Sequence, residues 1–91
     1  MKFAIEIGNT ERHLLEYQFN QLLGRLLIKV NERPIRRSVR LFNEPVLETY
    51  TFPVGNQEIS DVRIEKERKQ LFGCRNRLYV NNRLLRVFEG V

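Results

Sequence analysis

Apolar and polar residues alternate along most of this chain, with the two-residue period of a half-buried β-strand. Residues 3–7 alternate in this way until Gly8-Asn9 ends the run. Residues 47–52 and 59–64 repeat the alternation on either side of a break at Pro53. The pattern predicts short strands joined by turns, whereas the charged stretch 65–69 is predicted to be a solvated turn.

Residues 10–23 fit two interpretations. Leu15, Phe19 and Leu22 have helical spacing, and Thr10 is a candidate N-cap. Leu15, Tyr17 and Phe19 also alternate as a strand would. Because the surrounding chain has the pattern of strands, we expect a strand here, closed by a bend at Gly24.

Two hairpins with related sequences are predicted at residues 25–36 and 75–86. In the first, two alternating runs flank Asn31-Glu32, and asparagine tolerates the positive φ that a type I′ turn needs. Asn81-Asn82 stands at the same place in the second. Duplication and convergence both explain the identical pairs, which are Arg25/Arg75, Val30/Val80, Asn31/Asn81, Arg33/Arg83 and Arg36/Arg86.

A two-residue turn sets which residues face each other across a hairpin. If that register continues without interruption, Ile28 lies opposite Ile35 and Leu27 opposite Arg36. In the second hairpin, Arg77 then lies opposite Arg86, and directly opposed residues share a face. We therefore expect an apolar face on the hairpins and a basic face behind it, made of Arg25, Lys29, Arg36, Arg75, Arg77 and Arg86.

The strands together predict an all-β fold, an antiparallel β-sandwich of about seven to eight strands built from hairpins. A chain of 91 residues has the length of a single domain, which we place at 1-91. The predicted core consists of Ile5, Leu15, Tyr17, Phe19, Ile28, Val30, Ile35, Val62, Ile64, Leu78, Val80 and Leu85.

The charge is unevenly distributed along the chain. There are 16 Lys and Arg residues against 11 Asp and Glu, and the net charge is +5. The basic excess lies in the hairpin segments, 25–43 and 63–91. A basic face interleaved with Tyr79 and Phe88 predicts binding of nucleic acid or another polyanion. The alternative is a solvated outer face whose arginines pair with carboxylates such as those of Glu48, Glu58 and Asp61.

Few side chains suggest catalysis. Cys74 is the only cysteine and His13 the only histidine, which excludes an internal disulfide and disfavours a four-ligand zinc site. His13 with Glu16 could form an acid–base pair, but a structural histidine fits better. Arg75 beside Cys74 would favour a thiolate, but a buried inert thiol fits better. We expect no enzyme activity, no metal and no cofactor.

Residues 36–40, Arg36-Arg37-Ser38-Val39-Arg40, resemble one half of the PilZ cyclic-dinucleotide motif, Arg-x-x-x-Arg. The second half would stand at Asp61-Val62-Arg63, which lacks the serine and the glycine of that motif. The incomplete pattern argues against this assignment.

The single cysteine favours a reducing compartment, because small secreted domains are usually rich in disulfides. The apolar start of the chain is interrupted by Glu6 and too short for a signal-peptide core. The longest apolar run elsewhere, 26–28, cannot span a bilayer. We expect a cytoplasmic protein without membrane contact, monomeric or weakly homodimeric.

From His13 onward, the order of features resembles the N-terminal β-sandwich domain of the Fas apoptotic inhibitory molecule family. Both turn glycines of that family are replaced, by Glu32 and Asn82, and its tryptophan after the first hairpin has no counterpart. The segments that carry the resemblance are His13-Leu14-Leu15-Glu16-Tyr17, the hairpin from Gly24 to Arg33, the strand from Glu48 to Gly55, the strand from Ser60 to Glu65, and Leu78-Tyr79-Val80-Asn81-Asn82-Arg83.

The resemblance implies a non-enzymatic all-β interaction domain, in a family linked to apoptosis control and to protection against protein aggregation. We therefore expect a module that binds a protein partner or a sheet edge. The alternative is nucleic-acid or anion binding through the arginine-rich sheet face.

Overall fold

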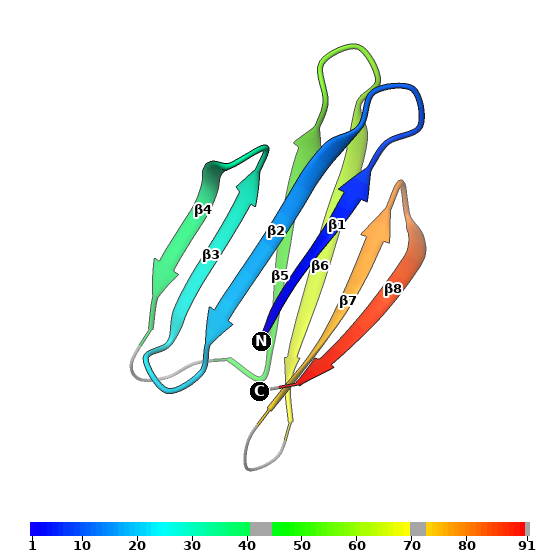
Figure 1. The fold of residues 1–91 in the computed structure, drawn as a ribbon. Coiled ribbons are helices and arrows are strands. Elements are labelled where there is room, and N and C mark those ends of the chain that lie inside the picture. Colours follow the sequence, from blue (N-terminus) through cyan, green and yellow to red (C-terminus); the bar gives the residue numbers. More distant parts are fainter. Residues whose placement is uncertain (41–44, 70–72, 91) are drawn as a thin grey trace.

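The computed structural model describes residues 1–40, 45–69 and 73–90, which form strands and no helix (Figure 1). The N-terminal sheet contains, in chain order, β1 (Lys2–Ile7), β2 (His13–Asn20), β3 (Arg25–Val30) and β4 (Arg33–Val39). The C-terminal sheet contains, also in chain order, β5 (Leu47–Val54), β6 (Ser60–Arg68), β7 (Cys74–Val80) and β8 (Arg83–Gly90). All neighbouring strands are antiparallel. The predicted antiparallel β-sandwich is confirmed, as is a strand rather than a helix at β2.

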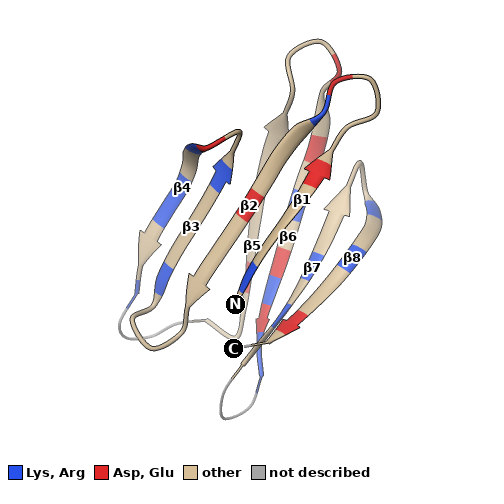
Figure 2. Cartoon of the chain, in the orientation of Figure 1, with Lys and Arg blue, Asp and Glu red and all other residues tan. Residues whose placement is uncertain are grey.

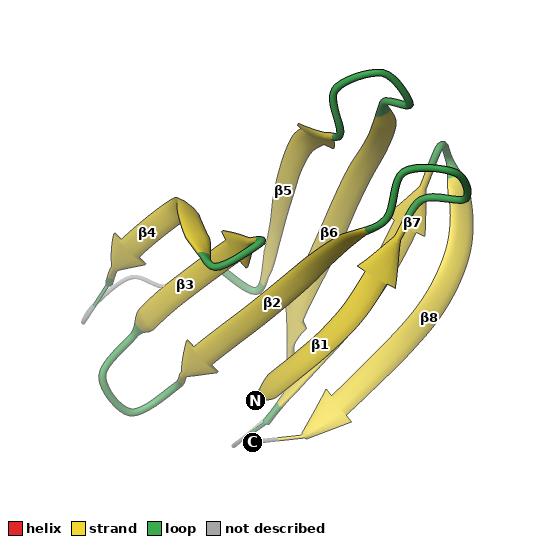
Figure 3. Ribbon diagram, turned by 45° about the horizontal axis from the view of Figure 1, so that its top comes forward, coloured by secondary structure: helices red, strands yellow, loops and turns green. Residues whose placement is uncertain are grey.

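The two sheets form two layers that share one hydrophobic core (Figure 3). Phe3 of β1 stacks on Phe88 of β8 with ring centroids 3.8 Å apart. Most of the predicted core is buried, and Ile5, Val30 and Val80 are partly buried against it. The buried core residues are Phe3, Ile7, Leu15, Tyr17, Phe19, Leu26, Ile28, Tyr50, Val54, Val62, Ile64, Cys74 and Leu78.

Each half of the chain is a four-stranded meander with the same turn chemistry. Asn31 and Glu32 both have positive φ, 50° and 67°, and Asn81 and Asn82 repeat these values at 51° and 66°. Positive φ at both central residues defines the predicted type I′ turn. Each turn asparagine also bonds the neighbouring strand: Asn31 Oδ1 accepts from the N–H of Leu14, and Asn81 Oδ1 accepts from that of Asp61. The repetition therefore extends beyond the hairpin sequences.

The loops β1–β2 and β5–β6 hold each other through two carboxylates, an arrangement we call the carboxylate clasp. The side chain of Glu58 accepts the N–H groups of Asn9, Thr10 and Glu11 at 2.8–3.1 Å. The side chain of Glu11 accepts those of Asn56, Gln57 and Glu58 at 2.5–3.5 Å. These hydrogen bonds stabilise the charged carboxylates.

The clasp depends on a glycine at the end of β1 and another at the end of β5. Gly8 and Gly55 have φ of 110° and 114°, a region that residues with a side chain rarely adopt. A Cβ atom at Gly8 would lie 2.0 Å from the carbonyl oxygen of Glu11, and one at Gly55 would lie 2.0 Å from that of Glu58. Both loops therefore need glycine for backbone conformation and for space.

The register predicted for the hairpins is wrong beyond the turns. A β-bulge between Ile28 and Lys29 shifts the pairing, so that Ile28 lies opposite Arg36 and Leu27 opposite Arg37. A bulge at the same place in the second hairpin puts Leu78 opposite Arg86 and Arg77 opposite Val87. A bulge adds one residue to one strand, which moves every later side chain to the other face. The predicted core residues Ile35 and Leu85 are consequently 42% and 49% exposed.

Two predicted boundaries in the C-terminal half are also wrong. Residues 65–68 belong to β6 instead of a solvated turn, because Glu65 and Glu67 alternate with the buried Lys66. β5 continues through Pro53, which lies on an edge strand where a missing N–H is tolerated. The sequence also predicts that the extended segment after β4 continues over residues 41–42, which fall outside the described residues.

Candidate functional site

The six arginines and lysines of the predicted basic face lie in different sheets and on different faces. Arg25 and Lys29 are on β3, whereas Arg75 and Arg77 are on β7 of the other sheet. The bulges turn Arg36 and Arg86 toward the core side, opposite the buried residues Ile28 and Leu78. The structure therefore does not assemble these residues into one continuous basic face.

On the C-terminal sheet, acidic residues neutralise the arginines of β7. Arg75 Nε lies 2.8 Å from Glu89 Oε1, and Arg75 Nη1 lies 3.6 Å from Glu67 Oε1. Arg77 Nη2 also approaches Glu67 Oε1, at 3.5 Å. Hydrogen bonds from Lys69 and Arg75 lower the pKa of Glu89 to about 2. The sequence alternative, a solvated face of paired charges, describes this sheet, although the pairing carboxylates are Glu67 and Glu89 rather than those expected.

The two aromatic residues expected on the basic face are engaged within the protein. The guanidinium of Arg63 lies 4.2 Å from the centroid of the Tyr79 ring. Phe88 lies opposite the buried Asn76, on the core side, and stacks on Phe3. The expected interleaving of both rings with the arginines is therefore wrong for Phe88.

The β3–β4 hairpin carries Lys and Arg residues on both of its strands (Figure 2). Within residues 1–40, 45–69 and 73–90, no carboxylate lies within 4.0 Å of a cationic nitrogen of Arg25, Lys29, Arg33 or Arg37. Arg36 donates a hydrogen bond to the carbonyl oxygen of Thr51 at 3.3 Å. The acidic residue of this hairpin is Glu32, in the turn. The hairpin is thus a strongly basic surface.

Strand β4 is both basic and uncovered. It lies at the edge of the N-terminal sheet, and every residue from Arg33 to Val39 is exposed except the half-buried Ser38. Its apolar residues Ile35 and Val39 are 42% and 63% exposed. An edge strand presents unpaired backbone N–H and C=O groups along one side. This strand therefore combines a backbone template, apolar side chains and positive charge.

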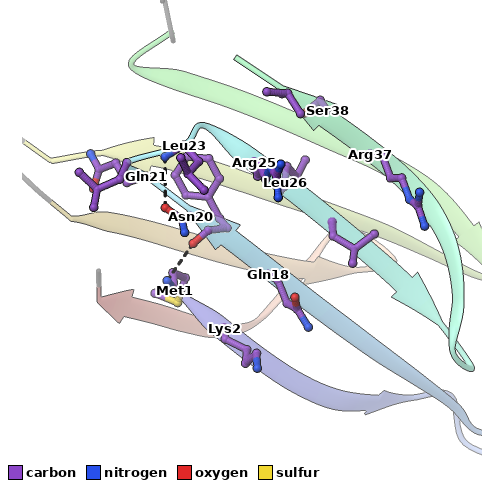
Figure 4. A pocket seen from close by; sticks show the side chains of 14 residues that line it. Met1, Lys2, Gln18, Asn20, Gln21, Leu23, Arg25, Leu26, Arg37 and Ser38 are labelled. Carbon is purple, nitrogen blue, oxygen red and sulfur yellow. Dashed lines mark hydrogen bonds between the residues drawn. The ribbon is translucent and has the colours of Figure 1, made fainter. Parts of the chain in front are cut away.

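A hollow of about 870 Å³ lies at the β2–β3 end of the N-terminal sheet (Figure 4). The described residues of its lining include three basic ones, Lys2, Arg25 and Arg37, and no acidic one. The other lining residues are Met1, Gln18, Phe19, Asn20, Gln21, Leu22, Leu23, Leu26, Leu27, Ser38 and Val39. This composition, apolar with a few charged groups, is typical of a binding site for an anionic ligand.

His13 has a structural role. Its Nδ1 lies 2.6 Å from Asn31 Nδ2, and its Nε2 lies 2.7 Å from Glu11 Oε1. A neutral ring that accepts from Asn31 and donates to Glu11 satisfies both contacts. Because both ring nitrogens are engaged with Asn31 and Glu11, the acid–base pair suggested for His13 and Glu16 is not formed. The pair with Glu11 ties a turn to the clasp.

A buried charge cluster lies between the sheets. Lys66 is 2% exposed, and its ammonium lies 3.8 Å from the centroid of the Phe19 ring and 3.7 Å from Glu48 Oε1. Tyr50 donates a hydrogen bond to the same oxygen of Glu48. The pKa of Tyr50 is raised, mainly because the side chain is buried and to a smaller extent because of this hydrogen bond. The cluster stabilises a buried cation by pairing it and by a cation–π contact. Cys74, the first residue of β7, is buried, as expected for an inert thiol.

Sequence analysis missed the clasp and the buried lysine. The clasp has a visible signal, because Gly8-Asn9-Thr10-Glu11 and Gly55-Asn56-Gln57-Glu58 share glycine, asparagine and glutamate at the same spacing. Lys66 has no such signal, since it stands within a charged run.

Comparison with known proteins gives no match to a family model, a curated protein or a solved structure. Among the described residues, no group of three or more His, Cys, Asp or Glu side chains is placed to hold a metal ion. The described segments also contain no helix with the length and hydropathy needed to cross a membrane. The resemblance to the Fas apoptotic inhibitory molecule family stays a prediction.

Proposed function

We propose that this chain is a non-enzymatic protein-interaction module that binds an extended, acidic partner segment along the edge strand β4. One observation carries the proposal: β4 is exposed along almost its whole length, and no carboxylate among the described residues pairs with Arg25, Lys29, Arg33 or Arg37 of its hairpin. The function implied by the family resemblance, binding of protein partners, agrees with it.

Strand addition supplies the affinity in this mode. An extended peptide placed beside an edge strand forms main-chain hydrogen bonds, and its alternate side chains contact the strand's neighbours. Arg36 and Arg37 point to opposite faces of β4, since successive side chains of a strand alternate. Acidic side chains on either face of the partner would therefore meet a cation.

A peptide of alternating glutamate and valine, about seven residues long, tests the proposal. We expect it to bind the ¹⁵N-labelled chain and to perturb the β4 amides. The same peptide with alternate backbone nitrogens methylated keeps its charges but cannot complete the ladder, so we expect its binding to disappear. Equal binding of the methylated peptide would exclude strand addition.

The second candidate is nucleic-acid binding through the same cations, favoured by the unpaired positive charge of the β3–β4 hairpin. Its affinity would fall steeply with salt, because cations that contact phosphates release counterions. Fluorescence anisotropy with a labelled single-stranded oligonucleotide at low salt tests it. Absence of binding there eliminates this candidate and leaves the first unaffected.

A further inference from the structure

We infer that the hollow on the N-terminal sheet recognises an extended protein segment in which an apolar residue is flanked by acidic residues two positions away on each side. This inference deepens the proposed function, because it assumes that the chain binds a protein segment. It names a second contact surface and the side-chain pattern that this surface selects.

The floor of the hollow is a row of side chains that crosses all four strands. Lys2 of β1 is paired with Gln18 of β2, Gln18 with Leu27 of β3, and Leu27 with Arg37 of β4. Directly paired residues share a face, so these side chains lie on the same side of the sheet. Figure 4 shows Lys2, Gln18 and Arg37 projecting on one side of neighbouring strands. The row thus has a cation at each end and a leucine between them.

The neighbouring row adds to the same surface. Asn20, Arg25 and Val39 are paired across β2, β3 and β4, and all three line the hollow. The turn between β2 and β3 contributes Leu22 and Leu23, which are 81% and 46% exposed. Large apolar side chains exposed beside cations favour a ligand that brings both apolar and acidic groups.

The dimensions of the row match an extended peptide. Neighbouring strands lie about 4.8 Å apart, so the backbone positions of Lys2 and Arg37 are separated by about 14 Å. Residues i and i+4 of an extended chain are also about 14 Å apart and point to the same side. A segment that crosses the strands can therefore place acidic residues at i and i+4 on the two cations and an apolar residue at i+2 near Leu27.

The corresponding face of the C-terminal sheet does not offer this site. Arg75, the counterpart of Arg25, is paired with Glu67 and Glu89. Val87 takes the place of Arg37, since Val87 lies opposite Arg77 as Arg37 lies opposite Leu27. The difference provides a matched control within the same molecule.

A labelled peptide with glutamate at positions i and i+4 and leucine at i+2, the other residues being serine, tests the inference. In fluorescence anisotropy with the full chain at low salt, we expect Lys2→Gln combined with Arg37→Gln to weaken binding about three- to tenfold, since both side chains are exposed and each exposed ion pair contributes modestly. Leu22→Ser combined with Leu23→Ser should also weaken it. Arg75→Gln combined with Arg77→Gln should leave it within about twofold, as expected for residues outside the contact.

Several outcomes would overturn the inference. The first is that the Lys2/Arg37 double variant has no effect on peptide binding, or weakens it no more than the Arg75/Arg77 double variant does. The second is that a peptide whose glutamates are moved to i+1 and i+3 binds as tightly as the original peptide. The third is that laurate, an anionic fatty acid without a peptide backbone, binds as tightly as the original peptide. Far-UV circular dichroism of each variant checks that it is folded.

The result is separable from that of the proposed function. A segment lying across the strands does not depend on the β4 ladder, so methylation of alternate backbone nitrogens should leave its binding unchanged. Loss of binding on methylation would instead assign the peptide to the β4 edge and contradict the crossing arrangement.

Discussion

The hairpins β3–β4 and β7–β8 have the same turn, the same bulge and the same position at a sheet edge, but opposite electrostatic environments. Asn20 lies opposite Arg25 on the N-terminal sheet, whereas Glu67 lies opposite Arg75 on the C-terminal sheet. On the other side of each arginine, Val39 stands where Glu89 does. The repeated features serve the fold. The feature that differs is the pairing of the first arginine: Arg75 is paired with Glu67 and Glu89, whereas no carboxylate of the described residues pairs with Arg25.

The largest expected effect tests whether the bulge of the β7–β8 hairpin leaves Leu78 in the core and Leu85 outside it. Leu78→Ala should lower the free energy of unfolding by about 2–5 kcal/mol, since this side chain is fully buried. Leu85→Ala should change it by about 0.5 kcal/mol or less, because Leu85 is 49% exposed. Urea denaturation measures both. Similar losses for the two variants would mean that Leu85 is in the core and that the hairpin has no bulge.

The next effect concerns the glycines of the clasp. Gly55→Ala should destabilise the fold by about 1–3 kcal/mol, because it combines a strained φ with a blocked Cβ position. Gly73→Ala is the matched control: its φ is 111°, but the nearest atom of the described residues would be 3.4 Å from its Cβ. We expect Gly55→Ala to lower the midpoint of thermal unfolding more than Gly73→Ala. The reverse order would show that the carbonyl oxygen of Glu58 does not block the Cβ position at Gly55.

Acid stability tests whether each half of the molecule contributes a stabilised carboxylate to the clasp. Hydrogen bonds from the backbone of Asn56 and the side chain of His13 lower the pKa of Glu11 from its ordinary value of 4.5 to about 2, and backbone hydrogen bonds also lower that of Glu58. Because a lowered folded-state pKa stabilises the fold above the unfolded value, this contribution should be lost as the pH falls from about 4.5 toward 2. Glu11→Gln and Glu58→Gln should each reduce the loss of stability over this range. A pH dependence unchanged in both variants would contradict the clasp.

The smallest effect concerns the surface ion pairs. Arg75→Gln should lower stability slightly at low salt, and the difference should vanish at high salt, since exposed ion pairs are screened. Arg25→Gln should not lower it, because no carboxylate of the described residues pairs with Arg25 and its removal reduces repulsion. Chemical denaturation at two salt concentrations compares them. Equal losses would show that both arginines are paired.

The fold was predictable because its signals are local. Strand alternation and turn asparagines predicted both hairpins, and the asparagines adopt the positive φ that the turns require. The bulges were not predictable, because nothing in the apolar runs 26–28 and 78–80 marks where an extra residue enters the pairing. One extra residue in the pairing was enough to put Ile35 and Leu85 outside the core.

The candidate site was less predictable, because it depends on which strands become neighbours. Counting charges located the basic hairpins but could not show that Glu67 would lie beside Arg75 while Asn20 would lie beside Arg25. The buried Lys66 shows the same limit, since only the packed structure places Glu48 and Phe19 around its ammonium.

The most direct test gives the N-terminal hairpin the charges of the C-terminal one. The double variant Asn20→Glu and Val39→Glu places carboxylates on both sides of Arg25, at two exposed positions. The reverse variant, Glu67→Asn and Glu89→Val, frees Arg75. Titration of both ¹⁵N-labelled variants with the alternating glutamate and valine peptide should abolish the β4 perturbations in the first and retain them in the second. Undiminished binding to the first variant would contradict the claim that unneutralised charge makes this hairpin the binding surface.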